Sequence, residues 1–214
     1  MRVLAIPVKS LSHAKQRLSG VLSPLERGAL TLAMLEDVLD GALAITGWET
    51  WIVSPDEAVL EIASRRGARA VAEEKPQLSA AVRQIEADAT DRAADALAVL
   101  LADTPLVTAE ALTIALHTLG PVVLAPAESD GGTNLLVRRP PRSIRARFGP
   151  SSFHRHRAAA AERGLPVAVA DLPELAFDLD APDDILTLLR ARRAGRTREV
   201  CLAMDLTSRL RVRA

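Results

Sequence analysis

One continuous apolar run, Ala96-Leu97-Ala98-Val99-Leu100-Leu101-Ala102, stops at Asp103-Thr104-Pro105 and constrains the fold more than any other stretch. A short apolar run bounded by a turn signal is typical of a strand buried on both faces, as in a parallel sheet. A buried helix segment is the alternative, but the early stop favours the strand. Because ligands of open α/β sheets bind at the carboxyl ends of strands, Asp103 is either a functional carboxylate or the cap of the following turn.

Strand and helix signals alternate along the rest of the chain. Further strands are expected at 3–8, 50–53, 69–72, 122–125 and 167–170. Helices are expected from the start signals at Ser23 and Ser54, and over 79–94, 108–120 and 183–193. This alternation predicts one α/β domain with a largely parallel sheet between helices. We expect the domain to span 1–194 and a C-terminal extension, 195–214, to pack on it or on a neighbouring subunit, with possible short strands at 200–206 and 210–212.

Composition excludes several classes of protein. Among the 214 residues, Lys plus Arg and Asp plus Glu both number 27, so no global field calls for nucleic acid or a membrane surface. Aromatic residues are 2%, which argues against a base-stacking platform. No apolar run approaches the roughly 18 residues of a membrane span. A single cysteine cannot form an internal disulfide, which fits a reducing cytoplasm.

Cations follow the first predicted strand. Lys9, Lys15 and Arg17 lie in a loop that is well placed to hold phosphates. The loop contains no glycine, so it is neither a Walker loop nor a Rossmann fingerprint. A solvated loop with scattered charge is the alternative.

A strong local charge bias lies in residues 131–161, which contain seven arginines and no acidic residue. The bias indicates an anionic small ligand or a partner, with a solvated basic face as the alternative. Residues 129–134 form a glycine-containing turn that would let a ligand approach the backbone, and 148–153 resemble a helix start suited to an anion. His154 and His156 would not share a helix face, which argues against a metal site there.

Asp178-Leu179-Asp180 is the second informative stretch. In an extended chain both carboxylates point to one side and Leu179 to the other. Two such close carboxylates repel unless a cation lies between them, and Mg²⁺ prefers oxygen ligands. Asp180 as the cap of the next helix is the alternative. With Asp103 as a third carboxylate, we favour a metal site.

The chain resembles the guanylyltransferases of coenzyme F420 biosynthesis that act on 2-phospholactate or phosphoenolpyruvate. The resemblance covers nearly the whole chain to about residue 190 and keeps the family's order. Its pieces are Pro7-Val8-Lys9, Ala14-Lys15-Gln16-Arg17-Leu18, Asp103-Thr104-Pro105-Leu106, Asp130-Gly131-Gly132-Thr133-Asn134, Phe148-Gly149-Pro150-Ser151-Ser152-Phe153 and Asp178-Leu179-Asp180-Ala181-Pro182-Asp183-Asp184.

This resemblance implies a nucleotidyltransferase fold of the glycosyltransferase A type, Rossmann-like, with a mixed sheet. It implies transfer of GMP from GTP to a phosphorylated three-carbon acid, with release of pyrophosphate. It places the acceptor at Thr133, Gly149 and Ser152, and Mg²⁺ at Asp103, Asp178 and Asp180. By the same resemblance the nucleotide is bound by Pro7, Val8, Lys9, Lys15, Arg17 and Ser79, and catalysis depends on Lys15, Arg17 and Asp103.

Two departures from the family pattern stand out. Thr104 replaces a leucine, and Gln77-Leu78-Ser79 stands where relatives often carry Gly-Leu-Asn near the nucleotide. A nucleotidyltransferase for a sugar phosphate or a molybdopterin, or a non-catalytic anion-binding relative, is the alternative. Phosphoenolpyruvate, 2-phospholactate and 3-phosphoglycerate all remain as acceptors, with phosphoenolpyruvate favoured because an Ala- and Arg-rich chain suggests a bacterial source. A homodimer is also possible.

Overall fold

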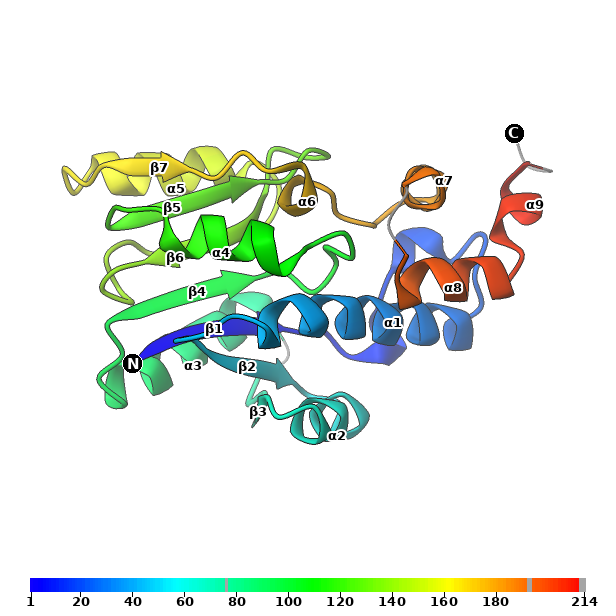
Figure 1. Ribbon diagram of the computed structural model, residues 1–214, viewed down its shortest axis with the longest axis horizontal. Helices are drawn as coiled ribbons and strands as arrows, with labels where there is room; N and C mark the ends of the chain where they lie inside the picture. The colour runs from blue at the N-terminus through cyan, green and yellow to red at the C-terminus, as the bar shows by residue number, and fades with distance from the viewer. Residues whose placement is uncertain (76, 192–193, 212–214) are drawn as a thin grey trace.

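The computed structural model describes residues 1–75, 77–191 and 194–211, and places a central sheet between two layers of helices (Figure 1). The strands are β1 (Arg2–Pro7), β2 (Glu49–Ser54), β3 (Arg69–Ala72), β4 (Ala96–Leu100), β5 (Val122–Pro126), β6 (Thr133–Arg138) and β7 (Val167–Val169). The helices are α1 (Pro24–Leu43), α2 (Glu57–Arg65), α3 (Leu78–Asp91), α4 (Ala109–His117), α5 (Ser152–Ala161), α6 (Pro173–Ala176), α7 (Pro182–Arg190), α8 (Arg196–Ala203) and α9 (Leu206–Arg211), with short 3-10 turns η1 (Leu11–His13) and η2 (Gln16–Leu18).

The described strands form a seven-stranded sheet in the order β3-β2-β1-β4-β6-β5-β7. β6 runs antiparallel to both of its neighbours, and the other pairs are parallel. The parallel strands therefore end at one edge of the sheet, toward which the arrowheads of β2, β4 and β5 point in Figure 1. The predicted mostly parallel sheet is confirmed, but β6 was missed. No described helix has the length and apolarity to cross a membrane.

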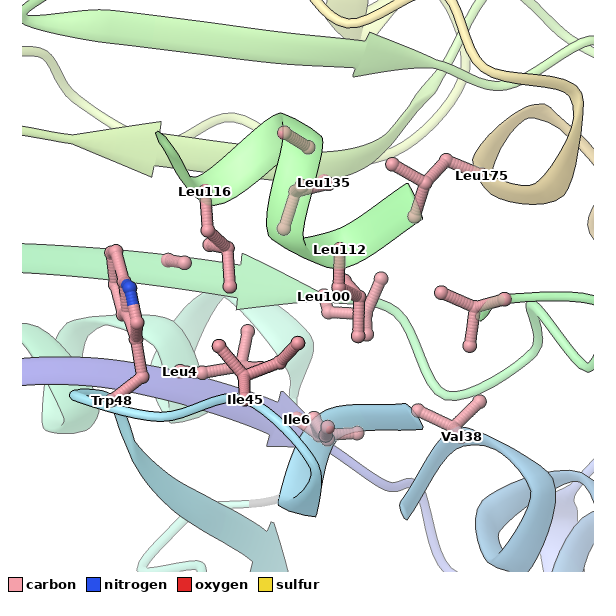
Figure 2. Close-up of a cluster of buried hydrophobic side chains, with 14 of the residues drawn as sticks. Leu4, Ile6, Val38, Ile45, Trp48, Leu100, Leu112, Leu116, Leu135 and Leu175 are labelled. Carbon is pink, nitrogen blue, oxygen red and sulfur yellow. The ribbon is translucent and has the colours of Figure 1, made fainter. Parts of the chain in front are cut away.

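β4 is buried on both faces, as the apolar run predicts. Ala98 and Leu100 pack into the cluster beneath α1 and α4, whereas Leu97 and Val99 pack into the cluster beneath α3. Figure 2 shows Leu112 and Leu116 of α4 directed toward the strands. The strand ends at Leu100, earlier than predicted, and Asp103 lies in the turn that follows.

The two similar helix-start signals have different outcomes. Ser23 forms the predicted capping box: its Oγ accepts a hydrogen bond from Glu26 N at 3.3 Å, and its N–H donates to the Glu26 carboxylate at 2.8 Å. Ser54 instead ends β2, and α2 begins at Glu57. The Asp56 carboxylate accepts from Leu11 N at 2.7 Å, so it fastens the loop after β1 instead of capping its own helix.

The C-terminal extension is helical, so the expectation of short strands at 200–206 and 210–212 is wrong for its described part; residue 212 lies outside the described residues. Cys201, Leu206 and Leu210 lie in a second apolar cluster with Leu30 and Met34 of α1, and this packing selects helices. Figure 1 shows α8 lying along the end of α1 that is remote from the sheet.

Asp37, which is buried in α1, holds the start of α8. Its carboxylate accepts from Arg196 N at 2.8 Å, from Thr197 N at 2.9 Å and from Thr197 Oγ1 at 2.6 Å. It therefore satisfies N–H groups that a helix start leaves free. A Cβ at position 195 would come within 2.9 Å of this carboxylate, so a larger residue there would force Asp37 to shift.

We expect Asp37→Ala to lower the free energy of unfolding by about 2–3 kcal/mol, because it leaves buried donors unpaired. Urea denaturation measures the change. Asp40→Ala is the matched control: Asp40 lies one helical turn away, is 43% exposed and pairs with arginines, and its loss should cost no more than about 1 kcal/mol. Equal losses in both variants would contradict the role given to Asp37.

Candidate active site

A cleft of about 340 Å³ opens at the carboxyl edge of the parallel strands. It lies between the loop after β1, the turn after β4 and the segment before α7. Its walls are Pro7, Val8, Lys9, His13, Ala14, Lys15, Gln16, Arg17, Thr31, Met34, Leu78, Leu101, Ala102, Asp103 and Asp180. The predicted phosphate-binding cations and two of the predicted metal ligands therefore share one cavity.

The Lys15 ammonium lies between two of these carboxylates. Its Nζ donates to Asp103 Oδ2 at 2.9 Å and to Asp180 Oδ1 at 2.7 Å. The side chain is only 8% exposed, and its backbone has the left-handed φ of 49°. Burial alone would lower the pKa of Lys15, but the charges of Asp103 and Asp180 raise it above its usual value. Lys15 is thus a permanently charged group at the centre of the cleft.

A backbone hydrogen bond joins the two carboxylate segments. Leu179 N donates to Asp103 O at 3.0 Å, and the Leu179 side chain is fully buried in the second apolar cluster. This contact places the segment 178–180 beside Asp103, but only Asp180 lines the cleft with Asp103, and Asp178 does not. Asp180 is not the cap of α7, contrary to one expectation: Asp184 accepts from Asp180 N at 2.8 Å and from Ala181 N at 2.6 Å.

Asp178 is the most deeply placed of the three carboxylates. Ser129 Oγ donates to both of its oxygens, at 3.1 and 3.0 Å. Burial, with the neighbouring charges of Asp103 and Asp180, raises the pKa of Asp178 to about 6 although the Ser129 hydrogen bond opposes the shift. Negative charge is therefore crowded here, and a cation would relieve it.

The donors fit a hard divalent cation in their chemistry. They are carboxylate oxygens, and Asp103 Oδ1 is buried without a hydrogen-bond partner. Within the described ranges, however, no three His, Cys, Asp or Glu side chains are arranged as a metal site. Lys15 takes the position between Asp103 and Asp180.

The other cations lie at the mouth of the cleft. Arg17 Nη1 is 3.7 Å from Asp180 Oδ2 and its side chain is 67% exposed, while Lys9 is also exposed. Pro7 and Val8 are buried in the cleft wall. An anion entering the cleft would therefore meet Lys9 and Arg17 first and Lys15 at its base.

The predicted acceptor residues meet in a separate network. Ser152 Oγ donates to Thr133 Oγ1 at 3.1 Å, and both side chains are buried. Phe153 N donates to Gly131 O at 3.2 Å, which joins the glycine-containing turn to the start of α5. Gly149, in the same loop, has a φ of +113° that favours glycine. Thr133 and Ser152 do not line the cleft.

His156 completes this network. Its Nε2 accepts from Arg147 N at 2.8 Å, so its Nδ1 carries the proton and donates to Thr133 Oγ1 at 3.0 Å. Burial, with the charges of nearby arginines, lowers the pKa of His156 from 6.5 to about 4. The spacing of two from His154 gives no sign of this buried position.

The His156 pKa predicts a loss of stability in acid. Between pH 6.5 and 4 the unfolded chain binds a proton at this histidine that the folded chain does not. The free energy of unfolding therefore decreases as the pH is lowered. The loss reaches about 3 kcal/mol by pH 4. Urea denaturation across this range should show that slope in the wild type and in the control His154→Gln, since His154 is exposed. The same slope in His156→Gln would contradict the assignment.

Other predicted features lie elsewhere. Ser79 borders a second cavity on α3, not the cleft. The arginine-rich segment is not one solvated face: Arg138 is fully buried beside Glu86, and Arg139 donates to the Leu116 and Gly120 carbonyls.

Ser129 was missed because no local pattern relates it to Asp178. Asp184 had a signal, since an acid two residues after a helix-initial proline is a common capping position.

Solved structures show that this fold is that of the nucleotidyltransferases. A Desulfovibrio desulfuricans protein assigned as a nucleotide-diphospho-sugar transferase is 20% identical, with a TM-score of 0.76 over 99% of this chain and 98% of its own. CMP:2-keto-3-deoxy-manno-octonic acid synthetase is 12% identical, with a TM-score of 0.58 over 88% and 97%.

Comparison of sequences identifies a narrower class of proteins than the fold does. Residues 1–210 match the family model of the CofC-like guanylyl transferases, and the chain belongs to that family of guanylyltransferases. The phosphoenolpyruvate guanylyltransferase of Sphaerobacter thermophilus is 43% identical over 86% of this chain and 90% of its own. The 3-phospho-D-glycerate guanylyltransferase of Phenylobacterium zucineum is 42% identical over 92% and 93%. The 2-phospho-L-lactate guanylyltransferase of Methanothermobacter thermautotrophicus is 40% identical over 84% and 80%.

Proposed function

We propose that the chain transfers GMP from GTP to phosphoenolpyruvate and releases pyrophosphate, as a step in coenzyme F420 biosynthesis, with 2-phospho-L-lactate as the alternative acceptor. The observation that carries the proposal is the meeting of Lys15, Asp103 and Asp180 in one cleft at the carboxyl edge of the sheet. Membership of the guanylyltransferase family identifies GMP as the transferred group. The choice of acceptor is supported by relatives of about 40% identity that bear the phosphoenolpyruvate name.

The chain's own residues would act mainly on charge. An oxygen of the acceptor phosphate attacks the α-phosphorus of GTP and forms a new P–O bond. The bond between the α-phosphorus and the oxygen that bridges it to the β-phosphate breaks, and pyrophosphate leaves. Lys9 and Arg17 would hold the triphosphate, and Lys15 would offset the charge that develops on the leaving group. The attacking oxygen is already ionised at neutral pH, so no general base is required.

Mg²⁺ is the cation that we propose for the three carboxylates. Asp103, Asp178 and Asp180 would hold it, and when bound it supplies charge neutralisation between two anionic substrates. The burial and the neighbouring carboxylates that raise the pKa of Asp178, together with the unpartnered oxygen of Asp103, support this assignment.

The nucleotide and the acceptor would occupy adjoining parts of the carboxyl edge of the sheet. Pro7, Val8 and the start of α3, including Ser79, would lie along the nucleotide. The hydroxyl groups of Thr133 and Ser152 are hydrogen-bonded to each other, and that of Thr133 also to His156. The loop with Gly149 would therefore present backbone groups to the acceptor. The C-terminal helix α8 packs on the α1 of its own chain, and a homodimer stays a prediction.

The test supplies GTP, Mg²⁺ and one acid at a time, and identifies the guanylylated product by mass. The panel holds phosphoenolpyruvate, 2-phospho-L-lactate, 3-phospho-D-glycerate, a sugar 1-phosphate and a molybdopterin, with ATP and CTP as competing donors. We expect product with phosphoenolpyruvate and GTP, and none after removal of divalent cations by a chelator. Product only with the sugar phosphate, or equal product with the chelator, would contradict the proposal.

A further inference from the structure

A second cavity, of about 320 Å³, lies beside α3 and shares no described wall residue with the nucleotide cleft. One wall is a single face of the helix, because Ser79, Val82, Arg83 and Glu86 follow the i, i+3, i+4, i+7 spacing. The opposite wall is the segment Arg145-Ala146-Arg147, which comes from the arginine-rich region. Of its wall residues, the proposed transfer uses only Ser79, which would lie along the nucleotide.

The cavity is lined by positive charge that no protein group neutralises. Arg83, Arg145 and Arg147 contribute guanidinium groups, and none of these has a hydrogen-bond or ion-pair partner among the residues that the structure describes. All three are exposed. Unpaired guanidinium groups in the walls of a hollow favour an anion, and their planar forks suit phosphate or carboxylate oxygens.

Glu86 is the acid in the cavity wall, and Arg138 neutralises it. Arg138 is fully buried, and its Nη1 donates to Glu86 and to Ile144 O, the latter at 3.2 Å. Its Nε and Nη2 are buried without a partner, at a cost of about 1–3 kcal/mol for each unmade bond. This pairing leaves Glu86 unable to satisfy the three exposed arginines, so the cavity keeps an excess of positive charge.

We propose that this cavity is a second anion site that binds a small molecule carrying a phosphate or carboxylate group. It adjoins the nucleotide cleft: Leu78 lines the cleft and Ser79 lines the cavity, in the same first turn of α3. Arg147 belongs to the segment that leads to Gly149. An anion held here contacts elements that border both substrates, and the site does not depend on which acid is the acceptor.

Calorimetric titration of the full chain, without nucleotide or metal, tests the site with pyrophosphate as the probe. The wild type should show two classes of sites, because the cleft also carries cations. Arg83→Gln with Arg145→Gln should weaken one class at least tenfold and leave the other. Lys9→Gln with Arg17→Gln should do the opposite. The matched control is Arg142→Gln with Arg157→Gln, which removes two exposed arginines of the same region outside the cavity.

Separate titrations with orthophosphate, phosphoenolpyruvate and pyruvate show whether the phosphate or the carboxylate is the bound group. Thermal unfolding confirms that each variant is folded, and Arg147→Gln provides a second variant if the first pair is not. A single class of sites in the wild type, or two classes unchanged in both cavity variants, would overturn the proposal. Neither result bears on GMP transfer, which the product assay measures independently.

Discussion

Asp103→Asn is expected to lower kcat for guanylyl transfer by at least about a thousandfold, equivalent to about 4 kcal/mol of transition-state stabilisation. The substitution keeps the shape of the side chain but removes the charge that faces Lys15 and one of the oxygens proposed for Mg²⁺. Because two anionic substrates must approach each other, loss of this charge should affect kcat more than KM for GTP. Steady-state rates of pyrophosphate release provide the measurement.

Asp171→Asn is the control for this substitution. Asp171 is an exposed carboxylate just after β7, outside the walls of the cleft, so its neutralisation should leave kcat within about twofold. Full activity of the Asp103→Asn variant would contradict the assignment of this cleft as the active site. Equal losses in both variants would indicate a general charge effect.

Lys15→Met is expected to lower kcat by about a thousandfold as well, because it removes the cation that we propose offsets the charge on the leaving pyrophosphate. The same change should have an opposite effect on metal affinity. With no ammonium between Asp103 and Asp180, Mn²⁺ used as a spectroscopic substitute should bind at least about tenfold more tightly. The melting temperature should fall without a divalent cation, since two partly buried carboxylates lose their partner, and should recover when Mg²⁺ is added.

Lys75→Met makes the same chemical change at an exposed position that lines none of the described cavities, and should alter neither property. Weaker Mn²⁺ binding by Lys15→Met would contradict the expectation, because it would mean that Lys15 supports the metal instead of competing with it.

The parts of the fold that were predicted are those with strong local signals. The apolar run into β4 and the capping box at Ser23 both specify their structure within a few residues. β6 was missed because Thr133 and Asn134 follow two glycines and Arg138 looks solvated, whereas pairing with β4 and β5 buries the whole strand. Helix α8 was missed because its start depends on Asp37, which is far away in the sequence.

The site divides in the same way. Asp103 and Asp180 line one cleft as the sequence predicts, whereas Asp178 accepts from Ser129 and is not one of the cleft's walls, so only part of the convergence could be predicted. The position of Lys15 could not, because its ion pairs span sequence separations of 88 and 165 residues. The arginine-rich segment had a visible charge bias, but only packing against α3 separates the buried Arg138 from the arginines that line the second cavity.

The hydrogen bond between Leu179 and Asp103 joins the turn after β4 to polypeptide that is synthesised much later. A nascent chain that has emerged as far as residue 170 already contains every described strand, yet it still lacks Asp178 and Asp180. With the roles that we propose for these two carboxylates, a chain of this length could form the sheet but would lack the metal site. Premature termination within that window should yield a protein without guanylyltransferase activity, however well its sheet folds.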